Sequence, residues 1–224
     1  MTVTAPPVWF DVPDAFTALD LGAGAAPRVE FMVARTPALR DEERVHLVLT
    51  QEIMIERLRA GQVAYAAHGL FRVAGERPRL SVAQLTVSTH RVDVGSEDVL
   101  DSIAARLAVP GLRRQVGFLD LAVGRALTVV EDRRFSTGAT VFGQARHREH
   151  VVRQVQLMLP FPDRRHLATV ALSTEFLHDW SDYIEIVGAV ARSVSFTAPD
   201  TSPRSADGPS PNPIRTALDG PVRP

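Results

Sequence analysis

Residues 151–196 read VVRQVQLMLPFPDRRHLATVALSTEFLHDWSDYIEIVGAVARSVSF, and this stretch decides the fold. Apolar runs over 150–159 and 167–173 flank a turn that contains Pro160, Pro162 and Asp163. Because β-branched residues favour strands and Pro-Asp sequences favour turns, the stretch predicts a β-hairpin. A helix is expected after it, since apolar residues recur at spacings of three and four: Trp180, Tyr183, Ile184, Val187, Val190, Ala191 and Val194.

The ends of this last helix carry charges of the expected sign. Asp179 is a plausible N-cap, Asp182 and Glu185 lie near the positive end, and Arg192 lies near the negative end. The stretch is therefore accounted for as core: two apolar strands, a turn and a helix with one apolar face.

Earlier segments predict further strands and one long helix. A first strand pair is predicted over residues 8–16, which alternate around Pro13, and 17–21. A second pair is predicted over residues 62–74 and 79–92. The second strand of this pair is expected to carry a β-bulge or to be buried on both faces. Between them, the Gly/Ala segment 21–27 is interpreted as a linker, residues 28–35 fit a strand or a helix, and 39–60 predict a helix that stops at Gly61.

The middle of the chain continues this pattern. Ser96 is expected to cap a helix that runs to Ala108, residues 116–121 and 125–132 predict another strand pair, and 135–144 predict a turn-rich loop. Short hairpin links imply a mostly antiparallel sheet, and about three amphipathic helices must cover it. The fold class expected is α+β, as a single domain over 8–196, followed by a disordered Pro/Ser/Asp-rich tail over 197–224.

Composition narrows the function classes. The 224 residues carry 25 basic and 26 acidic side chains, so a global field that attracts nucleic acid or an anionic membrane is not expected. The chain contains no cysteine, which excludes disulfides, thiolate nucleophiles and Cys-based metal sites. The N-terminal residues do not resemble a signal peptide and no apolar stretch reaches membrane-spanning length, so the expected location is cytoplasmic.

The histidines do not predict a metal site. His147 and His150 are three apart in RHREH, whereas a helical HExxH motif needs a spacing of four, and a solvated loop end is the preferred interpretation. His68 and His90 lie in paired strands and could sit near each other, with packing as the preferred role. His166 follows two arginines at a turn, where we expect solvent exposure.

Other catalytic signatures are missing from the sequence. No G-x-S-x-G elbow, phosphate loop or dinucleotide-binding fingerprint is found, and the acidic pairs Asp11/Asp14, Asp179/Asp182 and Glu131/Asp132 are explained by turns and caps. The sequence therefore favours a protein that is not an enzyme, with no cofactor and no metal.

Two terminal segments resemble the Mog1/PsbP-like fold. The opening VWFDVPDAF at 8–16 is similar to the strand of that fold with an aromatic residue near a proline turn, and the closing IVGAVARSVSF at 186–196 is similar to its last helix. The group includes photosystem assembly proteins, a Ran-binding protein, LpqN-type lipoproteins and DcrB/Eag-type secretion chaperones, and the hairpin-plus-helix segment resembles an actinobacterial family. The resemblance covers roughly residues 8–196 and implies an α/β/α sandwich, a protein-binding role and no catalytic residue.

Three functions follow as hypotheses. The first is a non-enzymatic cytoplasmic protein-binding or adaptor module, for example a chaperone for a secreted or membrane-targeted partner. Its partner is expected to be a protein and not a nucleic acid or a membrane, with the oligomeric state open. The second is a small-molecule or lipid carrier with a cavity between the sheet and the C-terminal helix. The third is a hydrolase or cyclase using dispersed His or Asp residues. Candidate partner-binding residues flank the uncovered sheet face and the hairpin turn: Phe142, Arg146, His147, Phe161, Arg164 and Arg165.

Overall fold

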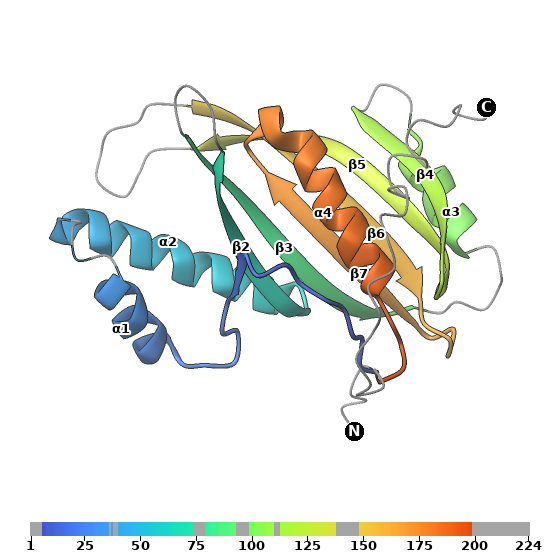
Figure 1. Ribbon diagram of the computed structural model, residues 1–224, viewed down its shortest axis with the longest axis horizontal. Helices are drawn as coiled ribbons and strands as arrows, with labels where there is room; N and C mark the ends of the chain where they lie inside the picture. The colour runs from blue at the N-terminus through green and yellow to red at the C-terminus, as the bar shows by residue number, and fades with distance from the viewer. Residues whose placement is uncertain are drawn as a thin grey trace.

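A computed structural model describes residues 6–35, 37, 40–73, 79–92, 99–109, 113–137 and 148–198. Within these residues, seven strands form one antiparallel sheet in the order β1-β2-β3-β7-β6-β5-β4 (Figure 1). The strands are β1 (Phe16–Ala18), β2 (Val63–Val73), β3 (Arg79–Arg91), β4 (Arg114–Leu121), β5 (Gly124–Thr137), β6 (Arg148–Pro160) and β7 (His166–Thr174). The helices are α1 (Ala25–Arg35), α2 (Asp41–Ala60), α3 (Val99–Leu107) and α4 (Trp180–Ser193), with a 3-10 turn over Leu177–Asp179. The expected α+β class with a mostly antiparallel sheet is confirmed.

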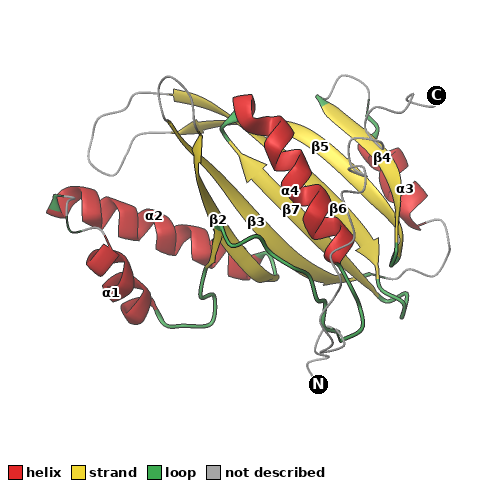
Figure 2. Ribbon diagram, viewed as in Figure 1, coloured by secondary structure: helices red, strands yellow, loops and turns green. Residues whose placement is uncertain are grey.

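Helix α4 lies diagonally across one face of the sheet (Figure 2). Every second residue of the central strands points toward it, as the two-residue period of a strand requires. The resulting core includes Leu85 and Val87 of β3, Leu157 and Leu159 of β6 and the apolar stripe of α4 that the sequence predicts. The hydroxyl groups of Tyr183 and Ser81 share a buried hydrogen bond of 2.6 Å, which fixes the height of α4 over β3.

The opposite face carries a smaller apolar cluster under α3. Leu100 of α3 packs with Leu127 and Val129 of β5 and with Leu167 of β7. These strand residues alternate with those that face α4, so helices cover both faces of the sheet at different places.

One strand pair joins the two halves of the sheet. Strands β1–β3 come from the first part of the chain and β4–β7 from the second, and β3 pairs with β7 from Gln84↔Ser173 to Arg91↔His166. This pairing bridges some 80 residues of sequence, whereas most neighbours in the sheet follow each other along the chain.

Helices α1 and α2 form a hairpin that extends beyond the β2 side of the sheet (Figure 1). Ile55, near the C-terminal end of α2, is fully buried, and Met32 of α1 is also buried. The Arg28 guanidinium binds Glu52 through two hydrogen bonds, of 2.9 Å and 2.5 Å, and ties the two helices together.

The N-terminal segment crosses the end of α4. Trp9 and Ser195 exchange two backbone hydrogen bonds of 2.9 and 2.8 Å, and the amide of Asp11 donates to Ser193 Oγ. The segment then turns at Pro13 into β1, where the ring of Phe16 packs against Phe71. Gly69 permits this ring contact, because a Cβ there would lie 2.5 Å from Phe71 Cε2.

Several sequence expectations need correction. The first strand pair is reduced to β1 and the Trp9–Ser195 bridge, and the ambiguous 28–35 segment is helical. The irregular register lies between Val63 and Tyr65 at the start of β2, and not on β3. Asp179 occupies the N-cap position of α4, but its side chain makes no capping hydrogen bond. Strand β5 extends to Thr137, into the expected loop, while Ser96 and the 199–224 part of the tail lie outside the described residues.

Candidate binding surfaces

An apolar row runs along the outer side of α2. Val45, Leu49 and Ile53 follow at spacings of four, so they form one ridge of the helix surface. Their exposed fractions are 50 %, 44 % and 55 %, and Phe31 of the neighbouring α1 is 59 % exposed. Most large exposed hydrophobic residues of the described chain therefore lie on this hairpin, and the row is named the α2 row below.

Acidic residues bound the α2 row at both ends. Glu42 precedes Val45 by three residues and Glu56 follows Ile53 by three, which places both carboxylates on the same helical face as the row. Both are exposed, and Glu56 accepts a hydrogen bond of 2.9 Å from Arg59. The surface is thus a short apolar ridge with a carboxylate at each end, and the one at Glu56 is paired with Arg59.

Polar contacts hold α2 in place behind this ridge. The hydrogen bonds from Arg28 lower the pKa of Glu52 by more than burial raises it, so the carboxylate stays ionised. Arg59 donates to the backbone oxygens of Leu21 and Ala23 at 2.6 to 2.8 Å, which anchors the linker before α1 to the end of α2. The ridge is therefore presented by a helix that is fixed at its C-terminal half.

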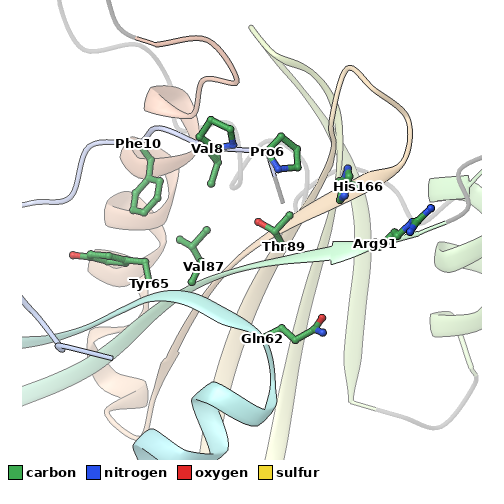
Figure 3. A pocket seen from close by; sticks show the side chains of 11 residues that line it. Pro6, Val8, Phe10, Gln62, Tyr65, Val87, Thr89, Arg91 and His166 are labelled. Atoms are coloured by element: carbon green, nitrogen blue, oxygen red, sulfur yellow. The ribbon is translucent and has the colours of Figure 1, made fainter. Parts of the chain in front are cut away.

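A pocket of about 730 Å³ lies between the N-terminal segment and the end of the sheet where β2 begins and β3 ends (Figure 3). Pro6, Val8 and Phe10 line it from the N-terminal segment. Gln62, just before β2, and residues of three strands complete the lining: Ala64, Tyr65, Val87, Thr89, Arg91 and His166.

A second hollow of about 340 Å³ lies on the opposite face, near the far end of β3. His68, Gln84 and Ser173 line it, together with Val152 of β6. Burial lowers the pKa of His68, so this ring is neutral at neutral pH. The neighbouring central surface is polar and uncharged, with Thr86, Thr169, Gln154 and Gln156 partly exposed.

The structure separates the predicted partner-binding residues. Phe142, Arg146 and His147 lie outside the described residues. Phe161 is 3 % exposed and stacks on Phe196, with ring centroids 4.4 Å apart, so its side chain belongs to the core and is not offered to a partner. Arg164 and Arg165 are exposed at the β6–β7 turn, where Arg164 adopts a φ of 55°.

His68 and His90 do not meet. His68 pairs with Gln84 and His90 with Leu167, so six residues of β3 separate their levels, roughly 20 Å along the strand. The His90 ring does contact the Ser88 hydroxyl at 3.0 Å. A nucleophilic serine also needs a group that orients the histidine and donors for the oxyanion, and the His90–Ser88 contact by itself supplies neither.

Sequence reasoning missed His166, which is buried and not exposed at the turn. Its Nδ1–H donates to Asp163 Oδ2 at 2.6 Å, and Asp163 Oδ1 accepts from the amides of Arg165 and His166. The aspartate three residues before the histidine was the available signal, because an aspartate in a turn often binds the backbone two residues on.

Among the described residues, no helix is long and apolar enough to cross a membrane, and no three His, Asp or Glu side chains are grouped as metal ligands. Comparisons with protein-family models, with curated proteins and with solved structures found no match. The Mog1/PsbP-like resemblance therefore stays a prediction, and the function has to be argued from the surfaces of this chain.

Proposed function

We propose that this protein is a non-enzymatic protein-binding module that docks a partner helix on the α2 row. The observation that supports the proposal is the exposure of Val45, Leu49 and Ile53 on one ridge of a helix that extends beyond the sheet. Helical partners use their own apolar residues at spacings of three and four to pack against such a ridge.

The size of the α2 row sets the strength of the contact. Fully burying a Val, Leu or Ile side chain stabilises by about 1.5–3 kcal/mol, so covering the exposed half of three gives roughly 3 kcal/mol. That figure corresponds to about a hundredfold in Kd. The row is a sizeable part of an interface, and further contacts around it must supply the rest.

Charge indicates the chemistry of the partner. Glu42 and Glu56 flank the row, so a partner helix with Arg or Lys beyond its apolar residues is attracted at both ends. In an antiparallel pairing of two copies centred on Leu49, Glu42 of each copy faces Glu56 of the other, which disfavours self-association through this row. A basic amphipathic helix is the partner that fits.

The proposed role of the partner and the proposed location in the cell rest on the sequence. The Mog1/PsbP-like resemblance, with its α/β/α sandwich, supports an adaptor or chaperone for a secreted or membrane-targeted partner in the cytoplasm. Such clients commonly carry basic and apolar residues together, as the α2 row requires.

A designed helical peptide tests the proposal. Its apolar residues follow spacings of three and four with arginines at both ends, and a second peptide has glutamates in place of the arginines. We expect saturable binding of the basic peptide, measured by fluorescence anisotropy, and at least tenfold weaker binding of the acidic one.

Matched variants locate the site. Val45→Glu on the row and Val109→Glu after α3 replace valines that are each 50 % exposed. Val45→Glu should weaken peptide binding at least tenfold while Val109→Glu leaves it unchanged. Equal binding of both peptides, or equal effects of both variants, contradicts the proposal, and so does a dimer in light scattering that Val45→Glu dissociates.

A further inference from the structure

The floor of the 730 Å³ pocket changes from apolar to cationic along one strand. Val87, Thr89 and Arg91 are alternate residues of β3 and point to the same side. Val87 is paired with Tyr65 of β2 at the apolar end, and Arg91 is paired with His166 of β7 at the polar end. The two ends are about 14 Å apart, because four residues of an antiparallel strand each advance about 3.4 Å.

The apolar end is built from an aromatic pair. The rings of Phe10 and Tyr65 meet edge to face, with centroids 5.2 Å apart, and Val8 lies beside them in the N-terminal segment (Figure 3). Burial raises the pKa of Tyr65, so its phenol is neutral over the physiological range. This end therefore offers a wall for an apolar body and no charge.

The polar end holds a histidine whose orientation is fixed. Asp163 accepts the Nδ1–H of the buried His166, which leaves Nε2 as the free nitrogen of the ring. Burial raises the pKa of Asp163, but the hydrogen bonds from the Arg165 amide and from His166 together lower it by a larger amount. The net pKa of Asp163 is therefore lowered. Arg91 lies directly across the strand pair, and Thr89 offers a hydroxyl one step inward (Figure 3).

The position of the pocket follows from unequal strand lengths. The pairing of β2 with β3 begins at Val63↔Ser88, so Thr89 and Arg91 extend beyond the start of β2. Gln62, with a φ of 56°, turns the chain from α2 into β2 at this point. The N-terminal segment, anchored by Trp9 to Ser195, forms the roof over the gap.

We propose that this pocket binds a small organic carboxylate with an extended apolar body. The carboxylate lies at the Arg91–His166 end, where the fork of the Arg91 guanidinium can donate to both of its oxygens. The apolar body runs over Thr89 to the wall of Phe10 and Tyr65, with the fully buried Val87 beneath this end. The volume lies within the range of small-molecule sites, and a few polar groups at one end of an apolar pocket fix a ligand's orientation.

This site is independent of the α2 row, and its ligand is a small molecule and not a protein. It also differs from a cavity between the sheet and α4, because the side chains of Val187 and Val190 fill that space in the core. The two proposals can therefore fail separately.

Decanoate and its neutral counterpart 1-decanol test the inference by isothermal titration calorimetry on the full chain. We expect decanoate to bind with one site per chain and at least tenfold more tightly than decanol. Arg91→Gln should weaken decanoate binding at least fivefold and leave decanol binding unchanged. Arg165→Gln, which removes an exposed guanidinium at the neighbouring turn, is the matched control and should leave both affinities unchanged.

A second variant tests the apolar end. Thr89→Phe, at a partly exposed position on the strand floor, occupies the space of the apolar body and should weaken both ligands, and thermal unfolding shows whether the variant is folded. If Thr89→Phe unfolds, the smaller change Thr89→Leu takes its place. The inference is overturned by absent decanoate saturation, by equal affinities for decanoate and decanol, or by equal effects of Arg91→Gln and Arg165→Gln.

Discussion

Glu131 is a buried carboxylate on the α3 side of the sheet that pairs with two arginines. It is 6 % exposed and binds Arg114, its partner across β4 and β5, at 2.5 Å, together with Arg133. Burial raises the pKa of Glu131, but the hydrogen bonds from Arg114 and Arg133 lower it by more, and the net pKa is lowered. The charge is therefore needed, because its removal leaves two arginines without their anion.

Glu131→Gln should cost about 2 kcal/mol of the free energy of unfolding at neutral pH. A carboxyl whose folded pKa is lowered stabilises above its unfolded pKa of about 4.3, and this contribution is lost as pH falls through the folded value. The difference between wild type and Glu131→Gln should shrink over that acidic window in urea titrations. Asp101→Asn, which breaks the half-exposed pair with Arg125, should cost at most about 0.5 kcal/mol; equal costs for the two variants contradict the assignment.

At the scale of elements, the sequence predicted helices and strands correctly where the spacing of apolar residues and the residue types at the turns indicated the same element. The hairpin around Asp163 and the stripe of α4 are such cases, and the structure confirms both. Residues 28–35 were ambiguous because the burial of Arg28 depends on Glu52 of α2, 24 residues away, as well as on the backbone oxygens of Asp20 and Ala23. The burial of His166 was missed because it depends on the turn around Asp163 as well as on the strand.

A buried hydrogen bond between Ser81 and Tyr183 couples helix α4 to the sheet inside an apolar interface. Tyr183→Phe keeps the ring against Phe71 but leaves the buried Ser81 hydroxyl without its partner, which should cost about 1–2 kcal/mol in urea denaturation. The double variant Ser81→Ala/Tyr183→Phe should cost less than the sum of the two single variants, because both polar groups are then absent. Strictly additive costs contradict a direct Ser81–Tyr183 contribution.

At the scale of the whole molecule, the order of the strands in the sheet could not be predicted from the sequence. Adjacent strands could be paired through their short turns, but nothing local indicates that β3 meets β7. The candidate surfaces share this origin: the α2 row is exposed on a helix that extends beyond the β2 side of the sheet (Figure 1), and the pocket exists because Arg91 and His166 meet across β3 and β7. The sequence shows which residues are present, but it does not show that they lie close together in the fold.

The β3–β7 pair should make the two halves of the sheet unfold together. Leu85 and Leu172 are opposite each other and fully buried, so Leu85→Ala and Leu172→Ala should each cost about 3 kcal/mol, and the double variant less than the sum. Val82→Ala, on the same strand but exposed, should cost less than about 1 kcal/mol. Hydrogen exchange measured by mass spectrometry should show β2 and β5 losing protection together in Leu85→Ala, because the β3–β7 joint and α4 bind both halves into one cooperative core. Protection that persists in β5 while β2 exchanges would show instead that β4–β7 with α4 hold together without the first half of the chain.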